Sequence, residues 1–183
     1  MGFAYNFLKS PRQIGAVCPS SHYLASALVK AALSEAEGLI VDLGAGTGVV
    51  TGKLLEYGVP SHSIVAVERC STFAAGFQRK YPGVLALEAD ACRLTSLLQQ
   101  FRPDVPVRAV ISSLPFCTLP PDIRREVSAQ IATVLRQRGG LLIQYSYAWW
   151  MHFPLRRYGF APRQRYFVFR NVPPAIVEVY SLP

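Results

Sequence analysis

A glycine-rich segment flanked by two carboxylates is the part of the sequence best suited to chemistry. Asp42 stands two residues before a run of small and polar residues, Gly44, Ala45, Gly46, Thr47 and Gly48. Glu68 follows twenty residues after the last of them. Glycines in such a turn let a ligand approach the backbone closely. A carboxylate at that distance, at the end of the next strand, can accept hydrogen bonds from both hydroxyls of a ribose.

The spacing of the glycines and the charge of Asp42 favour one class of nucleotide ligand. Val49 stands where the dinucleotide fingerprint G-x-G-x-x-G has its third glycine. Asp42 would repel a pyrophosphate, whereas it suits a ligand that carries a positive amino group near the loop. S-Adenosylmethionine carries an amino group and a sulfonium. We therefore expect this cofactor rather than NAD, and we expect no metal.

A fold that gathers strand ends at one edge is needed to bring these residues together. Short apolar runs alternate with helical patterns, and a polar residue closes each of the first four runs. These residues are Asp42, Glu68, Asp90 and Ser112, separated by 26, 22 and 22 residues. This regular spacing is typical of successive βαβ units, in which the side chains that end parallel strands lie at the carboxyl edge of one sheet. The sequence predicts an α/β, Rossmann-like fold.

The apolar patterns predict seven strands and helices on both faces of a mostly parallel sheet. The strands are expected over Leu39–Leu43, Ile64–Glu68, Val84–Glu88, Val107–Ser112, Leu141–Tyr147, Arg165–Arg170 and Ala175–Tyr180. A short turn over Asn171–Pro174 joins the last two in an antiparallel hairpin. Helices are expected from His22 to Glu35, up to Tyr57, up to Tyr81, from Thr95 to Phe101 and from Pro121 to Arg138. Residues 1–183 should form one domain, with residues 1–36 as a capping segment and helix and residues 37–183 as the core.

Composition excludes several classes of protein. The chain has 183 residues, of which 51% are hydrophobic and 16% charged, too apolar for a disordered chain. No apolar stretch approaches the roughly 20 residues of a membrane-spanning helix, and the start lacks the pattern of a secretion signal. The four cysteines form no C-x-x-C pair, so we expect neither a zinc site nor disulfides. We expect the protein to work in the reducing cytoplasm.

Positive charge gathers at the two ends of the chain. Of the formal net charge of +8, residues 1–34 supply +3, residues 35–126 supply −1 and residues 127–183 supply +6. Aromatic residues, among them Trp149 and Trp150, are interleaved with the arginines of the last part. This combination suits an anionic lipid surface and equally suits RNA, whose bases stack on aromatic rings.

Four further segments carry a resemblance to a known family. They are Pro11–Ser21 (PRQIGAVCPSS), Ser112–Phe116 (SSLPF), Gln144–Tyr147 (QYSY) and Arg170–Ala175 (RNVPPA). The Asp42 loop resembles that of class I S-adenosylmethionine-dependent methyltransferases. With these segments, nearly the whole chain resembles the bacterial phospholipid N-methyltransferases of the soluble, membrane-associating type, which convert phosphatidylethanolamine to phosphatidylcholine.

The resemblance implies a set of site residues. Asp42 and the loop Gly44–Gly48 would hold the amino-acid part of the cofactor, Glu68 the ribose, and Asp90 with Ala91 the adenine. Further cofactor contacts are expected from Arg69, Ser112, Ser20 and Ser21. The headgroup pocket would consist of Ser113, Leu114, Pro115, Phe116, Tyr145 and Tyr147, with Tyr147 and Ser112 as catalytic residues. Ser20 and Ser21 fit a helix cap equally well, and Tyr147 fits a core position equally well.

The implied location is the inner face of the cytoplasmic membrane, with peripheral attachment of a cytoplasmic protein. The membrane residues would be Phe3, Phe7, Lys9, Trp149, Trp150, Arg156 and Arg157. The expected partners are a phospholipid substrate and an anionic membrane surface.

The alternative is an enzyme similar to the ribosomal-RNA adenine N6-dimethyltransferases, with nucleic acid as partner. That family has N-L-P-[YF] at the fourth strand, where this chain has Ser113 in place of Asn. We also expect none of its C-terminal helical domain. A non-catalytic binding module is a third interpretation, but it leaves the set Asp42, Glu68 and Asp90 unexplained.

Overall fold

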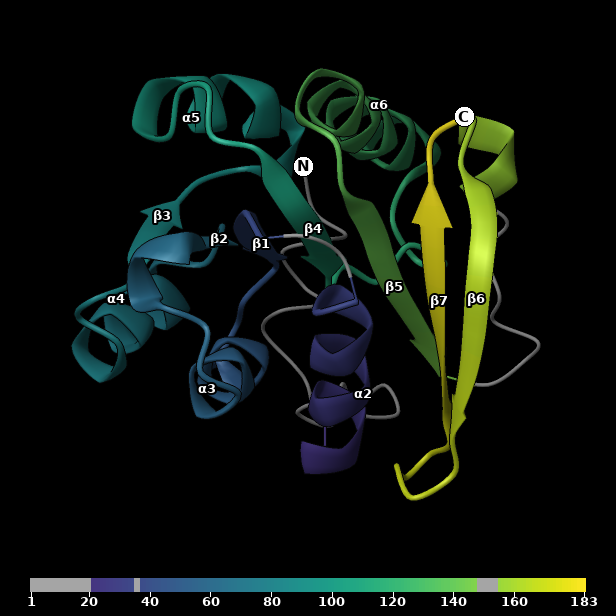
Figure 1. Cartoon of the computed structure of the whole chain (residues 1–183), viewed down its shortest axis with the longest axis horizontal. Coiled ribbons are helices and arrows are strands. Elements are labelled where there is room, and N and C mark those ends of the chain that lie inside the picture. The colour runs from purple at the N-terminus through teal and green to yellow at the C-terminus, as the bar shows by residue number, and fades with distance from the viewer. Residues whose placement is uncertain (1–20, 35–36, 148–154) are drawn as a thin grey trace.

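The molecule is built on a seven-stranded sheet in the order β3-β2-β1-β4-β5-β7-β6 (Figure 1). The computed structural model describes residues 21–34, 37–147 and 155–183. The strands are β1 (Leu39–Leu43), β2 (Ile64–Glu68), β3 (Leu85–Glu88), β4 (Val107–Ser112), β5 (Leu141–Tyr147), β6 (Ala161–Val168) and β7 (Ala175–Ser181). Strands β1 to β5 are parallel, and β7 is antiparallel to both β5 and β6. The predicted Rossmann-like sheet with a C-terminal antiparallel hairpin is confirmed.

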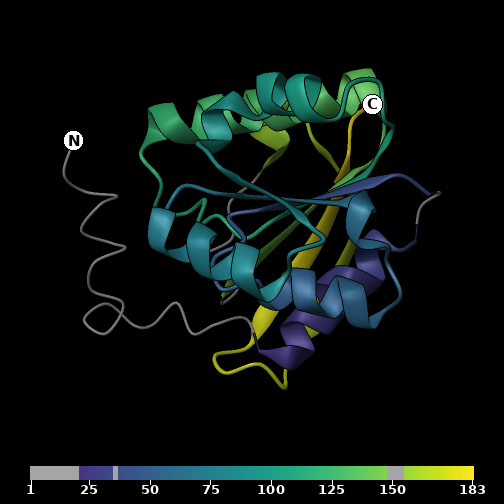
Figure 2. The same ribbon diagram turned by 90° about the vertical axis from the view of Figure 1, so that its left-hand side faces the viewer.

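Helices cover both faces of the sheet (Figure 2). They are α2 (His22–Ala32), α3 (Val49–Glu56), α4 (Ser71–Lys80), α5 (Leu94–Phe101) and α6 (Pro121–Arg138), with short 3-10 helices η1 (Ser61–Ser63), η2 (Ala91–Arg93) and η4 (Leu155–Tyr158). One apolar cluster joins α2 and α3 to the sheet, and a second joins α5, α6 and η4 to its other face. All five residues of β1 are buried, as expected for a central parallel strand covered on both sides.

Two elements differ from the prediction by more than one residue at an end. Helix α2 ends at Ala32, before the predicted end at Glu35. Strand β6 runs over Ala161–Val168, whereas the sequence predicts Arg165–Arg170. The first residues of β6 include Pro162 and lack alternating apolar positions, because β6 is an edge strand that pairs with β7 alone.

The course of β7 decides which loops share an edge. Because β7 reverses direction, the β6–β7 turn lies at the edge where β1 to β5 end. The first turn of α2 lies there too, since the backbone N–H of Ser21 donates to Oδ1 of Asn171 at 3.3 Å. We call this edge the carboxyl edge. Helix η4 precedes the start of β6 and therefore lies at the opposite edge of the sheet.

Candidate active site

Asp42 is a fully buried carboxylate at the carboxyl edge of β1. Its Oδ2 accepts a 2.6 Å hydrogen bond from Oγ1 of Thr51, in the first turn of α3. Its Oδ1 is buried and has no hydrogen-bond partner among the described residues. Burial raises the pKa of Asp42 to about 6, because the charged form loses its hydration. A buried carboxylate oxygen without a partner suits a cationic ligand.

The glycine-rich loop follows directly after this carboxylate. Gly44 has a φ of 79°, and a side chain there would collide with Leu114, whose Cδ2 would lie 2.9 Å from an added Cβ. At Gly46, by contrast, an added Cβ would meet nothing closer than 4.0 Å. The loop thus packs tightly at its start and leaves open space at its middle, where a ligand can approach the backbone.

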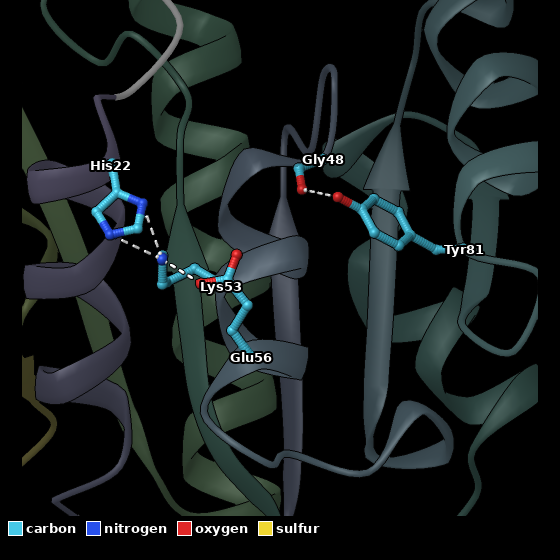
Figure 3. Close-up of polar contacts among 5 residues, drawn as sticks. All are labelled: His22, Gly48, Lys53, Glu56 and Tyr81. Atoms are coloured by element: carbon cyan, nitrogen blue, oxygen red, sulfur yellow. Dashed lines mark hydrogen bonds and ion pairs between the residues drawn. The ribbon is translucent and has the colours of Figure 1, made fainter.

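Tyr81 supports the end of the same loop and is not among the site residues predicted from the sequence. Its hydroxyl donates a 3.0 Å hydrogen bond to the carbonyl oxygen of Gly48 (Figure 3). A Cβ at Gly48 would lie 2.5 Å from the Tyr81 ring, and one at Gly52 would lie 2.4 Å from its hydroxyl. Both glycines therefore make room for this ring. Its place just after α4 and before Pro82 gave no indication of such a contact.

Glu68 links the glycine loop to the loop that follows β2. Its Oε2 accepts a hydrogen bond from the backbone N–H of Gly46 at 2.9 Å, and its Oε1 accepts one from Cys70 at 2.8 Å. A carboxylate can accept about four hydrogen bonds. Glu68 thus orders two loops and keeps acceptor capacity for the two hydroxyls of a ribose.

Asp90 lies at the start of η2, after β3. Its Oδ1 accepts from the backbone N–H of Cys92 at 2.9 Å, and its Oδ2 lies 3.9 Å from Nη1 of Arg69. Both side chains of this ion pair are about half exposed, at 51% for Arg69 and 41% for Asp90, so the pair adds little stability. Ala91 is half-buried beside them. Burial, then the nearby Asp90, raise the pKa of Cys92 to about 11, and its thiol stays protonated at neutral pH.

The segment after β4 forms the neighbouring wall. Ser112 is fully buried, and its Oγ accepts from the backbone N–H of Leu114 at 3.4 Å. The N–H of Ser113 donates to the carbonyl of Leu43 at 2.8 Å, which holds the segment against β1. Pro115 is exposed. The ring of Phe116 is only 3% exposed and belongs to the core on the α5–α6 face. The sequence predicts Phe116 in the wall of the headgroup pocket; because its ring packs into the core, a contact of Phe116 with the headgroup stays a prediction.

Gln144 of β5 fixes this wall and was missed as a site residue. Its Nε2 donates to the carbonyl oxygens of Leu114 and Tyr145, both at 3.0 Å. Its Oε1 is buried without a hydrogen-bond partner in the described part of the chain. The QYSY segment contains Gln144, but its sequence alone did not show that the amide reaches the neighbouring strand end.

Tyr145 and Tyr147 lie on one face of β5 with their rings in an edge-to-face contact. The ring centroids are 5.3 Å apart and the planes make an angle of 73°. Both side chains are half-buried and pack beside the cluster under α2 and α3. They form an aromatic corner at the end of β5, close to the β6–β7 turn, since Tyr147 pairs with Ala175.

The start of α2 is tied down by its own cap and by a buried lysine. Oγ of Ser21 accepts from the N–H of Leu24 at 3.3 Å, so Ser21 caps the helix. Lys53 of α3 is only 4% exposed; its Nζ lies 2.9 and 3.1 Å from the ring nitrogens of His22 and pairs with Glu56 (Figure 3). These contacts hold α2 against the helix that the glycine loop begins.

The other predicted site residues do not all lie at this edge. Ser20, Phe3, Phe7, Lys9, Trp149 and Trp150 lie outside the described residues. Arg156 and Arg157 are exposed in η4, at the opposite edge. In the described ranges, no group of three or more His, Cys, Asp or Glu side chains could hold a metal ion. Searched over the same ranges, no helix has the length and apolarity needed to cross a membrane.

The residues at the carboxyl edge fit S-adenosylmethionine. The unpartnered Oδ1 of Asp42 matches a cationic amino group, the open space at Gly46 admits the ligand, and Glu68 retains acceptor capacity. Ala45 is buried within the loop, and Thr47 is exposed at its outer side.

Known proteins share this architecture. The chain is 28% identical over 176 residues to an ornithine lipid N-methyltransferase from Singulisphaera acidiphila, covering 94% of this chain and 91% of that protein. The PH0226 protein from Pyrococcus horikoshii has a similar structure, with a TM-score of 0.69, 15% identity and full coverage of both chains. A 1,6-didemethyltoxoflavin-N1-methyltransferase from Burkholderia thailandensis, solved with S-adenosylhomocysteine, gives a TM-score of 0.68, 16% identity and coverage of 98% and 87%.

One protein family matches the part of the chain that contains the glycine loop, the acidic residues Asp42, Glu68 and Asp90, and the wall after β4. That family is described as "Methyltransferase domain", and it matches residues 40–139, more than half of the 183 residues. The class I fold and the cofactor prediction are both confirmed. The chain belongs to the methyltransferase domain family and is a class I enzyme that uses S-adenosylmethionine.

Proposed function

We propose that this methyltransferase transfers methyl groups to the amine of a membrane lipid, with phosphatidylethanolamine as substrate and phosphatidylcholine as end product. The observation that carries the proposal is the similarity over 94% of the chain to a lipid N-methyltransferase. That relative acts by its name on an ornithine lipid. A lipid amine is therefore the supported class, and the ethanolamine headgroup is the specific prediction.

The residues of the carboxyl edge have separate tasks in this reaction. S-Adenosylmethionine supplies an electrophilic methyl group when it is bound. Asp42 would hold its amino group, Glu68 its ribose and Asp90 its adenine. Ser112 and Gln144 keep the wall after β4 in place through their contacts with Leu114. The chain thus acts mainly by positioning the partners.

The amine has to react as the neutral base, although it is mostly protonated in water. The aromatic corner of Tyr145 and Tyr147 is half-buried, and burial lowers the pKa of an amine because the charged form loses hydration. Tyr147 would orient the amine. The faces of both rings suit the methylated ammonium product through cation–π attraction. Ser113, Leu114 and Pro115 would line the headgroup side.

The proposed place of action is the inner face of the cytoplasmic membrane. The membrane-contacting residues predicted from the sequence, including Arg156 and Arg157, stay predictions. The ribosomal-RNA alternative is not favoured, because Ser113 stands where that family has Asn and the full-length relative is a lipid enzyme.

Transfer of label from the methyl group of the cofactor tests the proposal. The protein is incubated separately with phosphatidylethanolamine vesicles, ornithine-lipid vesicles and undermethylated ribosomal RNA. We expect label in phosphatidylethanolamine, and none with the Asp42→Ala variant. Label only in ornithine lipid would keep the lipid-amine class and replace the headgroup, whereas label only in RNA would overturn the proposal.

A further inference from the structure

The β6–β7 turn and the first turn of α2 carry an exposed apolar surface. We call it the tip surface; its residues are Tyr23, Tyr166, Phe167, Phe169 and Val172. They are five of the seven large apolar side chains found exposed in the described part of the chain. Because Tyr166 and Phe167 are neighbours in β6, their side chains point to opposite faces of the sheet, so the surface wraps around the end of the hairpin. Phe167 is 57% exposed, Phe169 76% and Val172 80%. Concentrated apolar exposure of this kind marks an interaction site, whereas scattered single residues do not.

The tip surface lies beside the end of β5, at the carboxyl edge. Ala175, the first residue of β7, pairs with Tyr147 at the end of β5. On the other side, Asn171 accepts a hydrogen bond from the N–H of Ser21 and donates one to the carbonyl of Pro173 at 2.6 Å. The turn is therefore fastened to the start of α2. A partner that covers the tip surface would lie next to the aromatic corner, where the acceptor amine is proposed to bind.

The charge of this region favours an anionic partner. Arg170 lies over the ring of Tyr23, with its Cζ 4.7 Å from the ring centroid, and is exposed. Glu178 is the one acid in residues 127–183 of the sequence. It is 5% exposed and bonded to Arg165 at 2.6 Å. The hairpin thus presents an arginine and aromatic side chains with no exposed acid among its described residues.

The chemistry of the tip surface fits a bilayer better than RNA. Val172, the most exposed apolar residue, is aliphatic, and so cannot stack on a base. The rings of Phe167 and Phe169 stack on each other, 5.8 Å apart with an interplanar angle of 13°, which occupies faces that bases would need. Aromatic and aliphatic side chains next to arginine are typical of proteins that attach to the interface of anionic membranes.

We propose that the tip surface is the element that docks the protein on an anionic bilayer, inserting Phe167, Phe169 and Val172 between headgroups. The proposal deepens the proposed function, on which it rests, by naming the surface that meets the lipid. It also moves the docking site away from Arg156 and Arg157. Those residues lie in η4, before the start of β6. Phe167 lies six residues further along β6 than Ala161, its first residue, or about 20 Å at about 3.3 Å per residue.

Sedimentation with vesicles tests this assignment. Wild type and variants are mixed with vesicles of phosphatidylcholine and phosphatidylglycerol, and with phosphatidylcholine alone. We expect the double variant Phe167→Ser/Phe169→Ser to partition at least about tenfold more weakly, because the burial of even one ring contributes about one decade of affinity. Val172→Asp, at a more exposed turn position, should weaken binding as well. Phe101→Ser is the matched control, since Phe101 is an exposed ring at the end of α5.

Two outcomes would overturn the assignment. One is equal binding by wild type and the tip variants; the other is a loss with Arg156→Ala/Arg157→Ala as large as the loss with the tip variants. Sedimentation velocity adds a third: a dimer that the tip variants dissociate would make this surface a contact between copies of the chain. Circular dichroism and calorimetric binding of S-adenosylmethionine show that each variant is folded.

The experiments distinguish a wrong docking surface from a wrong proposed function. If the tip variants bind vesicles normally while wild type methylates phosphatidylethanolamine, the docking surface is wrong and the function stands. If wild type docks through the tip surface but labels no lipid amine, the function is wrong and the docking surface stands.

Discussion

At the scale of single residues, Asp42 shows how a ligand site conflicts with the stability of the free protein. Its Oδ1 is buried without a partner, and its pKa is raised from 3.8 to about 6. An unfolded chain ionises this group without that cost. The raised pKa of Asp42 therefore lowers the free energy of unfolding. This loss is absent below pH 3.8, grows as the pH rises to about 6 and is complete above it, at about 2–3 kcal/mol.

The variant Asp42→Asn tests both sides of this conflict. We expect it to be more stable than wild type at pH 8, with a difference that shrinks as the pH falls through about 6. Its affinity for S-adenosylmethionine should fall at least about tenfold, because a charged hydrogen bond is lost. Wild-type affinity should itself weaken below about pH 6, where Asp42 becomes protonated. Denaturant titrations and calorimetry across this range measure both effects; equal affinities at pH 8 would refute the role of Asp42.

We expect Tyr81 to act as a positioning residue for the glycine loop, through its hydrogen bond to Gly48. Removing its hydroxyl in Tyr81→Phe leaves the carbonyl of Gly48 without this donor, at a cost of about 1 kcal/mol. We expect the melting temperature to fall by about 2–4 °C, together with a loss of several-fold in affinity for S-adenosylmethionine. Tyr57→Phe, an exposed tyrosine just after α3, is the matched control. A purely structural role would lower the melting temperature of Tyr81→Phe and leave its affinity unchanged.

At the scale of elements, the sequence predicted most of the sheet because buried parallel strands are continuous apolar runs. Leu39–Leu43, Ile64–Glu68 and Val107–Ser112 have the predicted bounds. Helix Pro121–Arg138 is also as predicted, since proline marks its start and two glycines follow its end. The predicted bounds of β6 were wrong, because an edge strand has a weak pattern of apolar residues in the sequence.

Much of the site depends on contacts between elements that periodicity cannot reveal. The acidic strand ends were found because parallel strands finish at one edge. The contacts of Tyr81 with Gly48 and of Gln144 with Leu114 join residues 33 and 30 positions apart through side-chain directions. The burial of Phe116 likewise depends on which way the chain turns after β4.

The contact between the hairpin and α2 predicts a stability effect. Asn171 is 2% exposed and binds both Ser21 and Pro173. Asn171→Ala leaves the backbone N–H of Ser21 and the carbonyl of Pro173 without this partner, so we expect a loss of about 1–3 kcal/mol in the free energy of unfolding. Chemical denaturation measures it. Val172→Ala, at the next and exposed position, should stay within about 0.5 kcal/mol of wild type; equal effects would show that the contact adds no stability.

At the scale of the whole molecule, the charge of +8 predicts a dependence on salt. Association with vesicles that contain phosphatidylglycerol should weaken as ionic strength rises, because salt screens exposed arginines from anionic lipid. Binding of S-adenosylmethionine should change little, since Asp42 is buried. Vesicle sedimentation and calorimetry in the same salt series check the two. If vesicle binding does not change with salt, the prediction of an electrostatic contribution is wrong, and insertion of apolar residues is the sole attachment.

The reversal of chain direction at β7 has a kinetic consequence. It places a strand turn at the same edge of the sheet as Gly46 and Glu68. If the protein docks on a leaflet through this turn, as proposed, it meets its acceptor in two dimensions. We expect turnover to follow the mole fraction of amine lipid within the leaflet, so that spreading the same lipid among inert neighbours slows the reaction. Successive methylations could then take place during one residence on the surface, while fresh donor arrives from the water.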